Sequence, residues 1–214
     1  VRIMPSDAPE NWFEDIYAAS DASGKGVPWA TLAPAPLLVE WLDRAHPTGH
    51  GETALVVGCG LGDDALELAR RGFTVTAFDV AATAIDLARE RYGELAVEWH
   101  VGELFDLPPS WRGFFDLVVE HRTIQSLPPD WQARGQAAIA DLVRPGGSLA
   151  LVADLRPAGA PQEGPPWRLR PEELGPLAAA GLALVEERRQ IVRHDPVRER
   201  LRRVYACPLE APAP

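Results

Sequence analysis

Between residues 53 and 180, short apolar runs alternate with segments of helical periodicity, and this alternation restricts the fold more than any other feature. The apolar runs have the length and composition of buried strands. Strands joined by helices run parallel, with helices on both faces of the sheet. The expected strands are Thr53–Gly58, Thr74–Asp79, Leu95–Val101, Phe115–Val119 and Ser148–Ala153. The expected helices begin at Pro34 and after the predicted caps Asp63 and Asp64, and cover Ala82–Tyr92, Asp130–Val143 and Glu172–Ala180.

The end of the sequence follows a different pattern. Two further strands, Leu182–Val192 and Glu199–Cys207, are separated only by His194-Asp195-Pro196, which is typical of a hairpin turn. Strands joined without a helix run antiparallel. The sequence therefore predicts an α/β fold: a doubly wound, mostly parallel, seven-stranded sheet of Rossmann-like type with an antiparallel hairpin at its C-terminal end.

The first 33 residues are expected to be loop-rich. Trp12, Tyr17 and Trp29 lie among Gly, Ser, Asp and Pro residues, as in an aromatic arm or lid that packs onto another part of the chain. We expect residues 34–209 to form a single domain. Residues 210–214 are expected to be a disordered tail.

Composition excludes several classes of function. The net charge of -10 and the sequence pI of about 5.0 argue against nonspecific binding to nucleic acid or anionic membranes. No apolar run approaches the roughly 20 residues of a membrane span. The sequence starts without a signal-peptide pattern, so a cytoplasmic location is expected. Cys59 and Cys207 are the only cysteines, and neither a zinc set nor any other metal site is expected.

Three alternate glycines follow the first expected strand. Gly58, Gly60 and Gly62 let a ligand approach the backbone closely at the start of a helix, although an ordinary tight turn is the alternative. The G-x-G-x-G spacing differs from the G-x-G-x-x-G of dinucleotide-binding proteins. Asp63 and Asp64 follow at once and would repel a pyrophosphate, which favours a cationic or zwitterionic ligand. Cys59 is interpreted as a small packing residue.

Acidic residues come at the ends of the next two strands. Asp79 can accept hydrogen bonds from both hydroxyls of a ribose, and it can also cap the helix that starts at Ala82. Glu103 can accept a hydrogen bond from an adenine amino group while Leu104 packs on the ring. Asp106 competes with Glu103 for this role.

Glu120, His121 and Arg122 follow the fourth strand. Ligands of open α/β sheets bind at the carboxyl ends of the strands, so these side chains are expected to face a bound ligand. A local ion pair or a histidine satisfied within the fold is the alternative interpretation.

Together these features resemble the class I S-adenosylmethionine-dependent methyltransferases. The matching features are the G-x-G-x-G turn, Asp79, Gly102-Glu103-Leu104, Arg144-Pro145-Gly146-Gly147 and the closing hairpin. Within that superfamily the chain is similar to the thiopurine S-methyltransferase-like group. The segments that carry this likeness are Phe115–Pro129, Gly164–Leu174 and the aromatic arm. One departure is that Glu120-His121 stands where the group usually has Asp-Arg, and arginine comes one place later as Arg122.

The resemblance implies S-adenosylmethionine as cofactor and a small-molecule methyl acceptor, such as a thiol or another soft nucleophile. It implies a monomer or weak dimer without nucleic-acid or membrane partners. The implied catalytic residues are Glu120, His121 and Arg122. The implied cofactor-binding residues are Tyr17, Trp29, Gly58, Cys59, Gly60, Gly62, Asp79, Val80, Glu103, Leu104 and Glu120. Two alternatives stay open: an NAD(P)-linked oxidoreductase, and a cofactor-binding protein without turnover.

Overall fold

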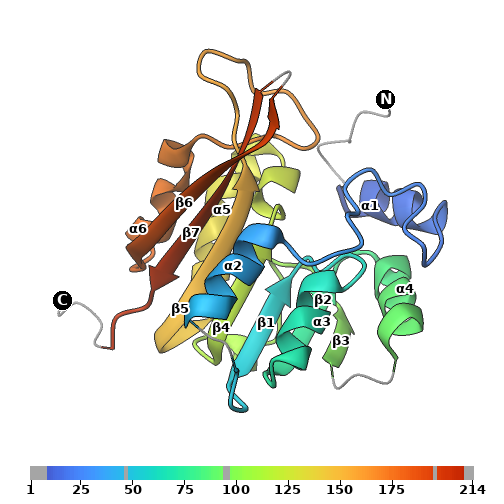
Figure 1. The fold of residues 1–214 in the computed structure, drawn as a ribbon, viewed down its shortest axis with the longest axis horizontal. Coiled ribbons are helices and arrows are strands. Elements are labelled where there is room, and N and C mark those ends of the chain that lie inside the picture. The colour runs from blue at the N-terminus through green and yellow to red at the C-terminus, as the bar shows by residue number, and fades with distance from the viewer. Residues whose placement is uncertain (1–8, 46–47, 94–96, 195–196, 210–214) are drawn as a thin grey trace. The chain divides into compact units, whose positions relative to one another are not determined.

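The computed structural model describes residues 9–45, 48–93, 97–194 and 197–209 (Figure 1). Its seven strands form one sheet in the order β3-β2-β1-β4-β5-β7-β6. The predicted α/β fold with a seven-stranded, mostly parallel sheet and a C-terminal antiparallel hairpin is confirmed. The chain divides into two compact units, Val1–Leu107 and Pro108–Pro214, which are described in turn.

The described residues of the first unit form three parallel strands and four helices. The strands are β1 (Thr53–Val57), β2 (Thr74–Asp79) and β3 (Val97–Val101), with β2 paired to both others. The helices are α1 (Pro9–Ala18), α2 (Pro36–Ala45), α3 (Asp63–Arg70) and α4 (Ala82–Tyr92). Nearly every residue of β1 and β2 is buried, as expected for parallel strands covered on both faces.

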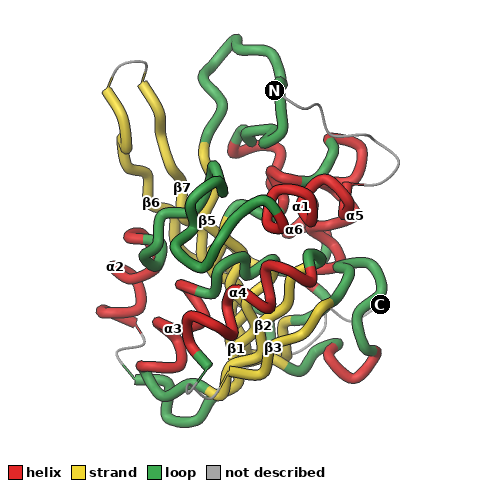
Figure 2. Tube along the Cα trace, turned by 90° about the vertical axis from the view of Figure 1, so that its right-hand side faces the viewer, coloured by secondary structure: helices red, strands yellow, loops and turns green. Residues whose placement is uncertain are grey.

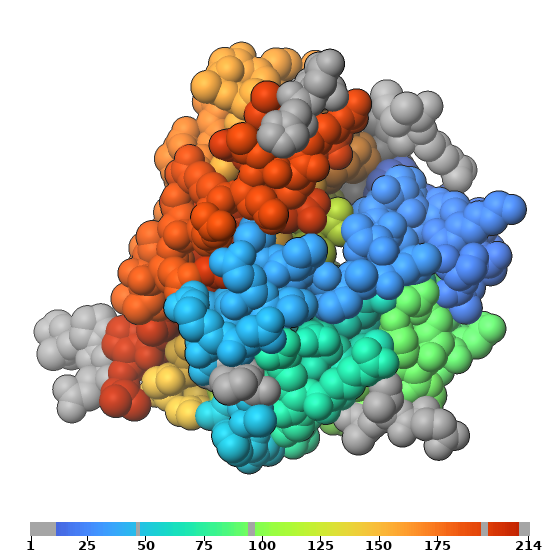
Figure 3. Space-filling model, viewed as in Figure 1, coloured from blue at the N-terminus to red at the C-terminus, as the bar shows by residue number. Residues whose placement is uncertain are grey.

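Helix α1 corrects the prediction of a loop-rich N-terminal segment. It packs against α4, and Figure 3 shows the blue N-terminal residues beside the green residues of α4. Its aromatic side chains pack against Trp29 of the arm and against a cluster that includes Ala84 and Leu87 of α4. Trp12, Phe13, Ile16 and Tyr17 recur at the spacing of one helix face, a sign of a helix that the assignment of these aromatic residues to an arm overlooked.

The second unit contains the other four strands and two α-helices. The strands are β4 (Phe115–His121), β5 (Val143–Asp154), β6 (Ala183–His194) and β7 (Val197–Ala206), and the helices are α5 (Pro129–Ala140) and α6 (Gly175–Ala179). Strands β4 and β5 are parallel, whereas β7 is antiparallel to both β5 and β6. Strand β5 ends opposite Arg200, so the rest of β6 and β7 forms a two-stranded ribbon, seen at the upper left of Figure 2.

Several boundaries in the second unit differ from the sequence prediction. Helix α5 ends at Ala140 and not at Val143, and the strands of the hairpin differ from their predicted bounds by one or two residues. Strand β4 continues to His121. Strand β5 begins at Val143 instead of Ser148, because the register between β4 and β5 shifts between Phe115 and Leu117. Pro145-Gly146-Gly147 therefore lie within β5. The helix expected over Glu172–Ala180 is a short 3-10 helix, Pro171–Leu174, followed by α6. A proline lies in the first turn of each, where its missing N–H costs no helical hydrogen bond.

No helix within the described ranges is long and apolar enough to cross a membrane. Residues 195 and 196 of the predicted hairpin turn and the predicted tail, 210–214, lie outside the described residues.

Candidate functional site

Main-chain hydrogen bonds bring the carboxyl ends of β1, β2 and β3 together in the first unit. The Cys59 N–H donates to the Phe78 carbonyl at 2.9 Å, which fixes the turn after β1 beside the end of β2. The Gly102 N–H donates to the Asp79 carbonyl at 3.0 Å, which fixes the segment after β3 in the same way. The residues predicted to bind a cofactor in this unit therefore follow neighbouring strand ends.

The glycine turn, Gly58–Gly62, has the backbone that its sequence predicts. Gly58, Gly60 and Gly62 have φ values of 58°, 53° and 85°, a region that other residues adopt rarely. A Cβ on Gly60 would lie 2.9 Å from the Tyr17 hydroxyl, and one on Gly62 would lie 2.6 Å from the Trp99 ring. Glycine is required here both by backbone conformation and by the close approach of two aromatic side chains.

Asp79 connects β2 to the glycine turn. One carboxylate oxygen accepts the Gly60 N–H at 2.8 Å, and the other accepts the Ala81 N–H at 3.0 Å. Burial is the main cause of a raised pKa at Asp79, and these main-chain N–H groups oppose it. Each oxygen keeps a second lone pair, so the carboxylate can still accept hydrogen bonds from ligand hydroxyls. The interpretation of Asp79 as the cap of α4 is wrong, because the N-cap residue is Ala81.

Glu103 and Leu104 follow β3. The Glu103 carboxylate accepts the Phe105 N–H at 3.0 Å, and the Leu104 side chain is buried. The Asp106 N–H donates to the Glu103 carbonyl at 2.9 Å, and the Asp106 side chain is exposed. The geometry therefore favours Glu103 over Asp106 as the acid held in a fixed position. Val80, next to Asp79, is half-buried.

The aromatic residues of the arm pack onto the glycine turn and α4. The Trp29 indole N–H donates to the Tyr17 hydroxyl at 2.9 Å, and the rings of Trp12 and Trp29 stack at 5.6 Å between centroids. Tyr17 is 3% exposed and shares an apolar cluster with Leu61 of the glycine turn. The cluster also contains Val27, Ala81, Ala84 and Leu87. This packing brings Tyr17 and Trp29 to the glycine turn.

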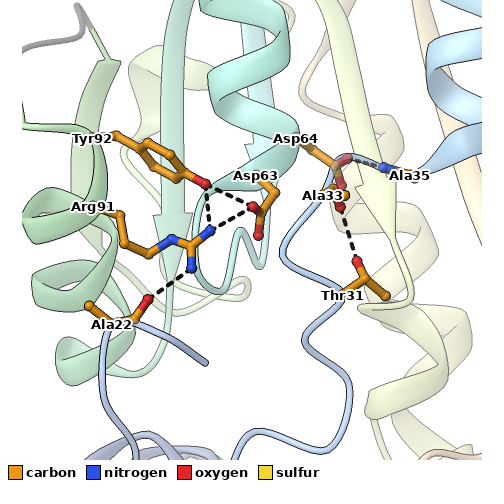
Figure 4. A network of polar contacts seen from close by, with 8 residues as sticks. All are labelled: Ala22, Thr31, Ala33, Ala35, Asp63, Asp64, Arg91 and Tyr92. Carbon is orange, nitrogen blue, oxygen red and sulfur yellow. Dashed lines mark hydrogen bonds and ion pairs between the residues drawn. The ribbon is translucent and has the colours of Figure 1, made fainter. Parts of the chain in front are cut away.

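Asp63 and Asp64 have protein partners, which corrects two predictions (Figure 4). Asp63 accepts hydrogen bonds from Arg91 and Tyr92, and Asp64 accepts the Ala35 N–H at 2.7 Å. Neither side chain caps α3, whose N-cap residue is Gly62. Because Arg91 offsets the charge of Asp63, this acid discriminates less against a pyrophosphate than its position in the sequence suggests.

In the second unit, Glu120 lies near the end of β4 and is fully buried. One carboxylate oxygen accepts the Ile124 N–H at 3.0 Å, while the other has no hydrogen-bond partner among the described residues. Burial raises the pKa of Glu120 to about 7, against the opposing effects of two main-chain N–H groups and the Arg122 charge. A carboxyl group of this kind can exist in either protonation state near neutral pH.

His121 and Arg122 continue the chain from Glu120, and both are half-buried. Arg122 has a positive φ of 68°, an uncommon conformation for a residue with a side chain, and its N–H donates to the Val152 carbonyl at 2.9 Å. This conformation turns the backbone sharply directly after β4. Strain of this kind is found often at functional sites.

Gln125 is a buried polar residue beside this turn that the sequence analysis missed. Its side-chain oxygen accepts the Asp154 N–H at 2.7 Å, and its carbonyl accepts the Trp167 N–H at 2.6 Å. Gln125 therefore ties the segment after β4 to the end of β5 and to the Gly164–Leu174 segment. In the sequence, the only sign of a role for Gln125 is its place within Phe115–Pro129, a segment similar to the thiopurine S-methyltransferase-like group.

Cys59 fits its interpretation as a packing residue. Burial is the largest cause, with the charge of Asp79, of a thiol pKa well above its usual value. A thiol of this kind is a poor nucleophile at neutral pH. Within the part of the chain that the structure describes, no group of three or more His, Cys, Asp or Glu residues could hold a metal ion.

Comparison with known proteins finds similarity in the region that contains the glycine turn. Residues 54–147 match a family model described as a methyltransferase domain. The ubiquinone biosynthesis O-methyltransferase of Aromatoleum aromaticum is 32% identical over 116 residues, which are 53% of this chain and 48% of that protein. The probable thiol methyltransferase 2 of Arabidopsis thaliana is 23% identical over 192 residues, 86% of this chain and 80% of that protein.

Solved methyltransferase structures share the fold. The 1,6-didemethyltoxoflavin-N1-methyltransferase of Burkholderia thailandensis, with its substrate and S-adenosylhomocysteine bound, superposes with a TM-score of 0.70 at 19% identity. The match covers 97% of this chain and 92% of that one. The chain spans about half the length of the first curated relative it matches and less than two thirds of the next two.

Proposed function

We propose that the chain is a class I S-adenosylmethionine-dependent methyltransferase, which transfers a methyl group from S-adenosylmethionine to a small-molecule acceptor. The match of residues 54–147 to a methyltransferase domain and the fold shared with solved methyltransferases support this proposal. One observation carries the proposal above all. Within the matched region, the Asp79 carboxylate holds the glycine turn by a hydrogen bond from Gly60 at 2.8 Å. A glycine turn open to close approach and an acid beside it suit a nucleoside-containing ligand.

The residues of the first unit fit such a ligand. Asp79 would accept hydrogen bonds from the ribose hydroxyls and Glu103 one from the adenine amino group, with Leu104 and Val80 against the ring. Tyr17 and Trp29 would provide aromatic surface for a cationic centre. Gly58, Cys59, Gly60 and Gly62 would line the turn along the backbone. When bound, S-adenosylmethionine supplies an electrophilic methyl group on a sulfonium ion.

On the acceptor side, the proposal assigns Glu120, His121 and Arg122. A soft nucleophile such as a thiolate needs mainly alignment, whereas an alcohol or amine needs a base. The name of the Arabidopsis relative supports a thiol, and the Phe115–Pro129 motif supports the thiopurine S-methyltransferase-like group. Glu120, with a pKa of about 7, suits the role of base for a harder acceptor.

The proposal keeps the expected organisation of the chain. Residues 1–33 act as an arm or lid and residues 34–209 as the methyltransferase domain, in a monomer or weak dimer. The expected cytoplasmic location and the absence of nucleic-acid and membrane partners also remain part of it. The similar Burkholderia enzyme was solved with a small-molecule substrate, which supports a small acceptor here.

Calorimetry with S-adenosylhomocysteine and with NAD tests the cofactor assignment. We expect micromolar binding of S-adenosylhomocysteine and no binding of NAD. Tight binding of NAD alone would favour the oxidoreductase alternative. A panel of thiol, alcohol and amine acceptors then separates an enzyme from a cofactor-binding protein without turnover. Methylation of no acceptor, despite tight cofactor binding, would favour the latter.

A further inference from the structure

Arg91 joins the N-terminal arm to the start of α3. One guanidinium nitrogen, Nη1, donates to the Ala22 carbonyl at 2.8 Å, and the other, Nη2, donates to the Asp63 carboxylate at 2.8 Å. The Tyr92 hydroxyl closes the network by donating to the same Asp63 oxygen at 2.7 Å. Figure 4 shows the guanidinium lying between Ala22 and Asp63. One side chain of α4 thus contacts both the arm and the residue directly after the glycine turn.

This network is shielded from solvent. The side chains of Arg91 and Asp63 are 14% and 16% exposed, whereas those of the nearby pair Arg89 and Asp86 are 51% and 76% exposed. Charged hydrogen bonds are stronger where water competes less, and the planar guanidinium can hold two acceptors in a fixed relation. The Arg91 contacts should therefore constrain the arm, while the exposed Arg89–Asp86 pair should contribute little to stability.

The arm is held at further points around the same turn. The Asp64 carboxylate accepts the Ala35 N–H, and the Glu14 carboxylate accepts the Thr83 N–H at 3.2 Å. Between these points, the Tyr17 hydroxyl lies so close to Gly60 that a Cβ there would be 2.9 Å away. The segment from Glu14 to Ala35 therefore passes beside the glycine turn, with Arg91 holding the arm near the middle of that segment.

We propose that Arg91 is a positioning residue, which acts through Asp63 and the Ala22 carbonyl to hold Tyr17 and Trp29 against the glycine turn. The inference rests on the proposed function, because the ligand that benefits is the adenosyl cofactor bound at that turn. Arg91 itself is assigned no contact with the cofactor. Asp63, which the sequence places at a ligand-binding turn, works in this proposal as the anchor for the arm.

The test compares Arg91→Ala and Arg91→Lys with the wild-type chain, and Arg70→Ala serves as the control. Arg70 is an exposed arginine of α3. Arg91→Ala should weaken S-adenosylhomocysteine binding roughly tenfold, since it removes the charge-assisted hydrogen bonds to the Ala22 carbonyl and the Asp63 carboxylate. It should also speed hydrogen exchange over residues 19–30 while leaving β1 and β2 unchanged. Arg91→Lys keeps the charge but has a single nitrogen, so it should restore the affinity only in part.

Tyr92→Phe covers the case in which Arg91→Ala does not fold. It removes only the hydroxyl that contacts Arg91 and Asp63, and a severalfold loss of affinity is expected. The proposal is overturned if both variants bind S-adenosylhomocysteine like the wild type, or if faster exchange spreads evenly over the first unit. Failure of the proposed function is separable: a wild-type chain that does not bind S-adenosylhomocysteine would still reveal the Arg91 contacts through exchange over residues 19–30.

Discussion

Asp79 and Glu120 are acidic residues in similar positions with different surroundings. Each lies near the carboxyl end of a buried strand, and burial raises the pKa of both. Main-chain N–H groups of Gly60, Val80 and Ala81 stabilise the Asp79 carboxylate, and each of its oxygens has a partner. Glu120 receives fewer such bonds, and its pKa reaches about 7.

The main-chain N–H groups around a buried acid determine which role its carboxyl group can take. Both oxygens of Asp79 accept main-chain N–H groups of the glycine turn and of Ala81, so Asp79 acts as a fixed acceptor. Glu120 is close to balance between its two protonation states at neutral pH, so it can exchange a proton. Substituting one acid at a time tests whether the two groups differ in this way.

The largest effect is expected from Asp79→Ala. The change leaves the N–H groups of Gly60 and Ala81 without their acceptor, at a cost of roughly 1–3 kcal/mol for each buried donor. The free energy of unfolding, measured with urea at neutral pH, should fall accordingly, and affinity for S-adenosylhomocysteine should fall with it. Asp79→Asn keeps one acceptor oxygen and should lose less. Equal stability of Asp79→Ala and the wild type would contradict the role of this carboxylate.

A pH-dependent effect is expected at Glu120. The folded-state pKa of about 7 lies above the ordinary 4.5, so the folded chain binds this proton more tightly than the unfolded chain. The contribution to stability is therefore complete below about pH 4.5 and is lost as the pH rises through 7. The loss amounts to roughly 3 kcal/mol by pH 8.

Glu120→Gln isolates this titration. The difference in unfolding free energy between the two chains should shift steadily from pH 5 to pH 8, with the wild type losing stability relative to the variant. Urea unfolding of the wild type and of Glu120→Gln at several pH values measures this difference in unfolding free energy. A constant difference across that range would show that Glu120 titrates alike in the folded and unfolded chains.

Much of this arrangement follows from local sequence. The bounds of β2 and α4 match the prediction at every residue. Gly72 and Asp79 bracket a run of β-branched and apolar residues, and Ile85, Ala88 and Tyr92 recur at the spacing of one helix face. Positive φ values at alternate glycines follow from the G-x-G-x-G pattern. Local features of this kind depend on residues close together in the chain.

Contacts between distant residues could not be predicted. Asp63 meets Arg91 across 28 positions, and the N–H of Asp154 finds the Gln125 side chain across 29. Nothing in the periodicity of either segment specifies the partner, so Asp63 was interpreted as a charge facing a ligand. The degree of burial of Glu120, which sets its pKa, likewise depends on packing that a single sequence does not reveal.

The smallest expected effect separates backbone conformation from packing at the glycine turn. Gly62 and Gly72 share a φ of 85°, but a Cβ on Gly72 would meet nothing within 4 Å, whereas one on Gly62 would lie 2.6 Å from Trp99. Substitution by alanine imposes similar conformational strain and a similar change in unfolded-state entropy at both sites, so these contributions cancel in the difference. Gly62→Ala should therefore lose more unfolding free energy than Gly72→Ala, by about 1–3 kcal/mol of overpacking.

Trp99→Leu in the Gly62→Ala background should recover part of that difference, which a double-mutant cycle by urea unfolding measures. Equal losses at the two glycines, or no coupling between Gly62 and Trp99, would mean that the turn is fixed by its hydrogen bonds to Asp79 and not by packing.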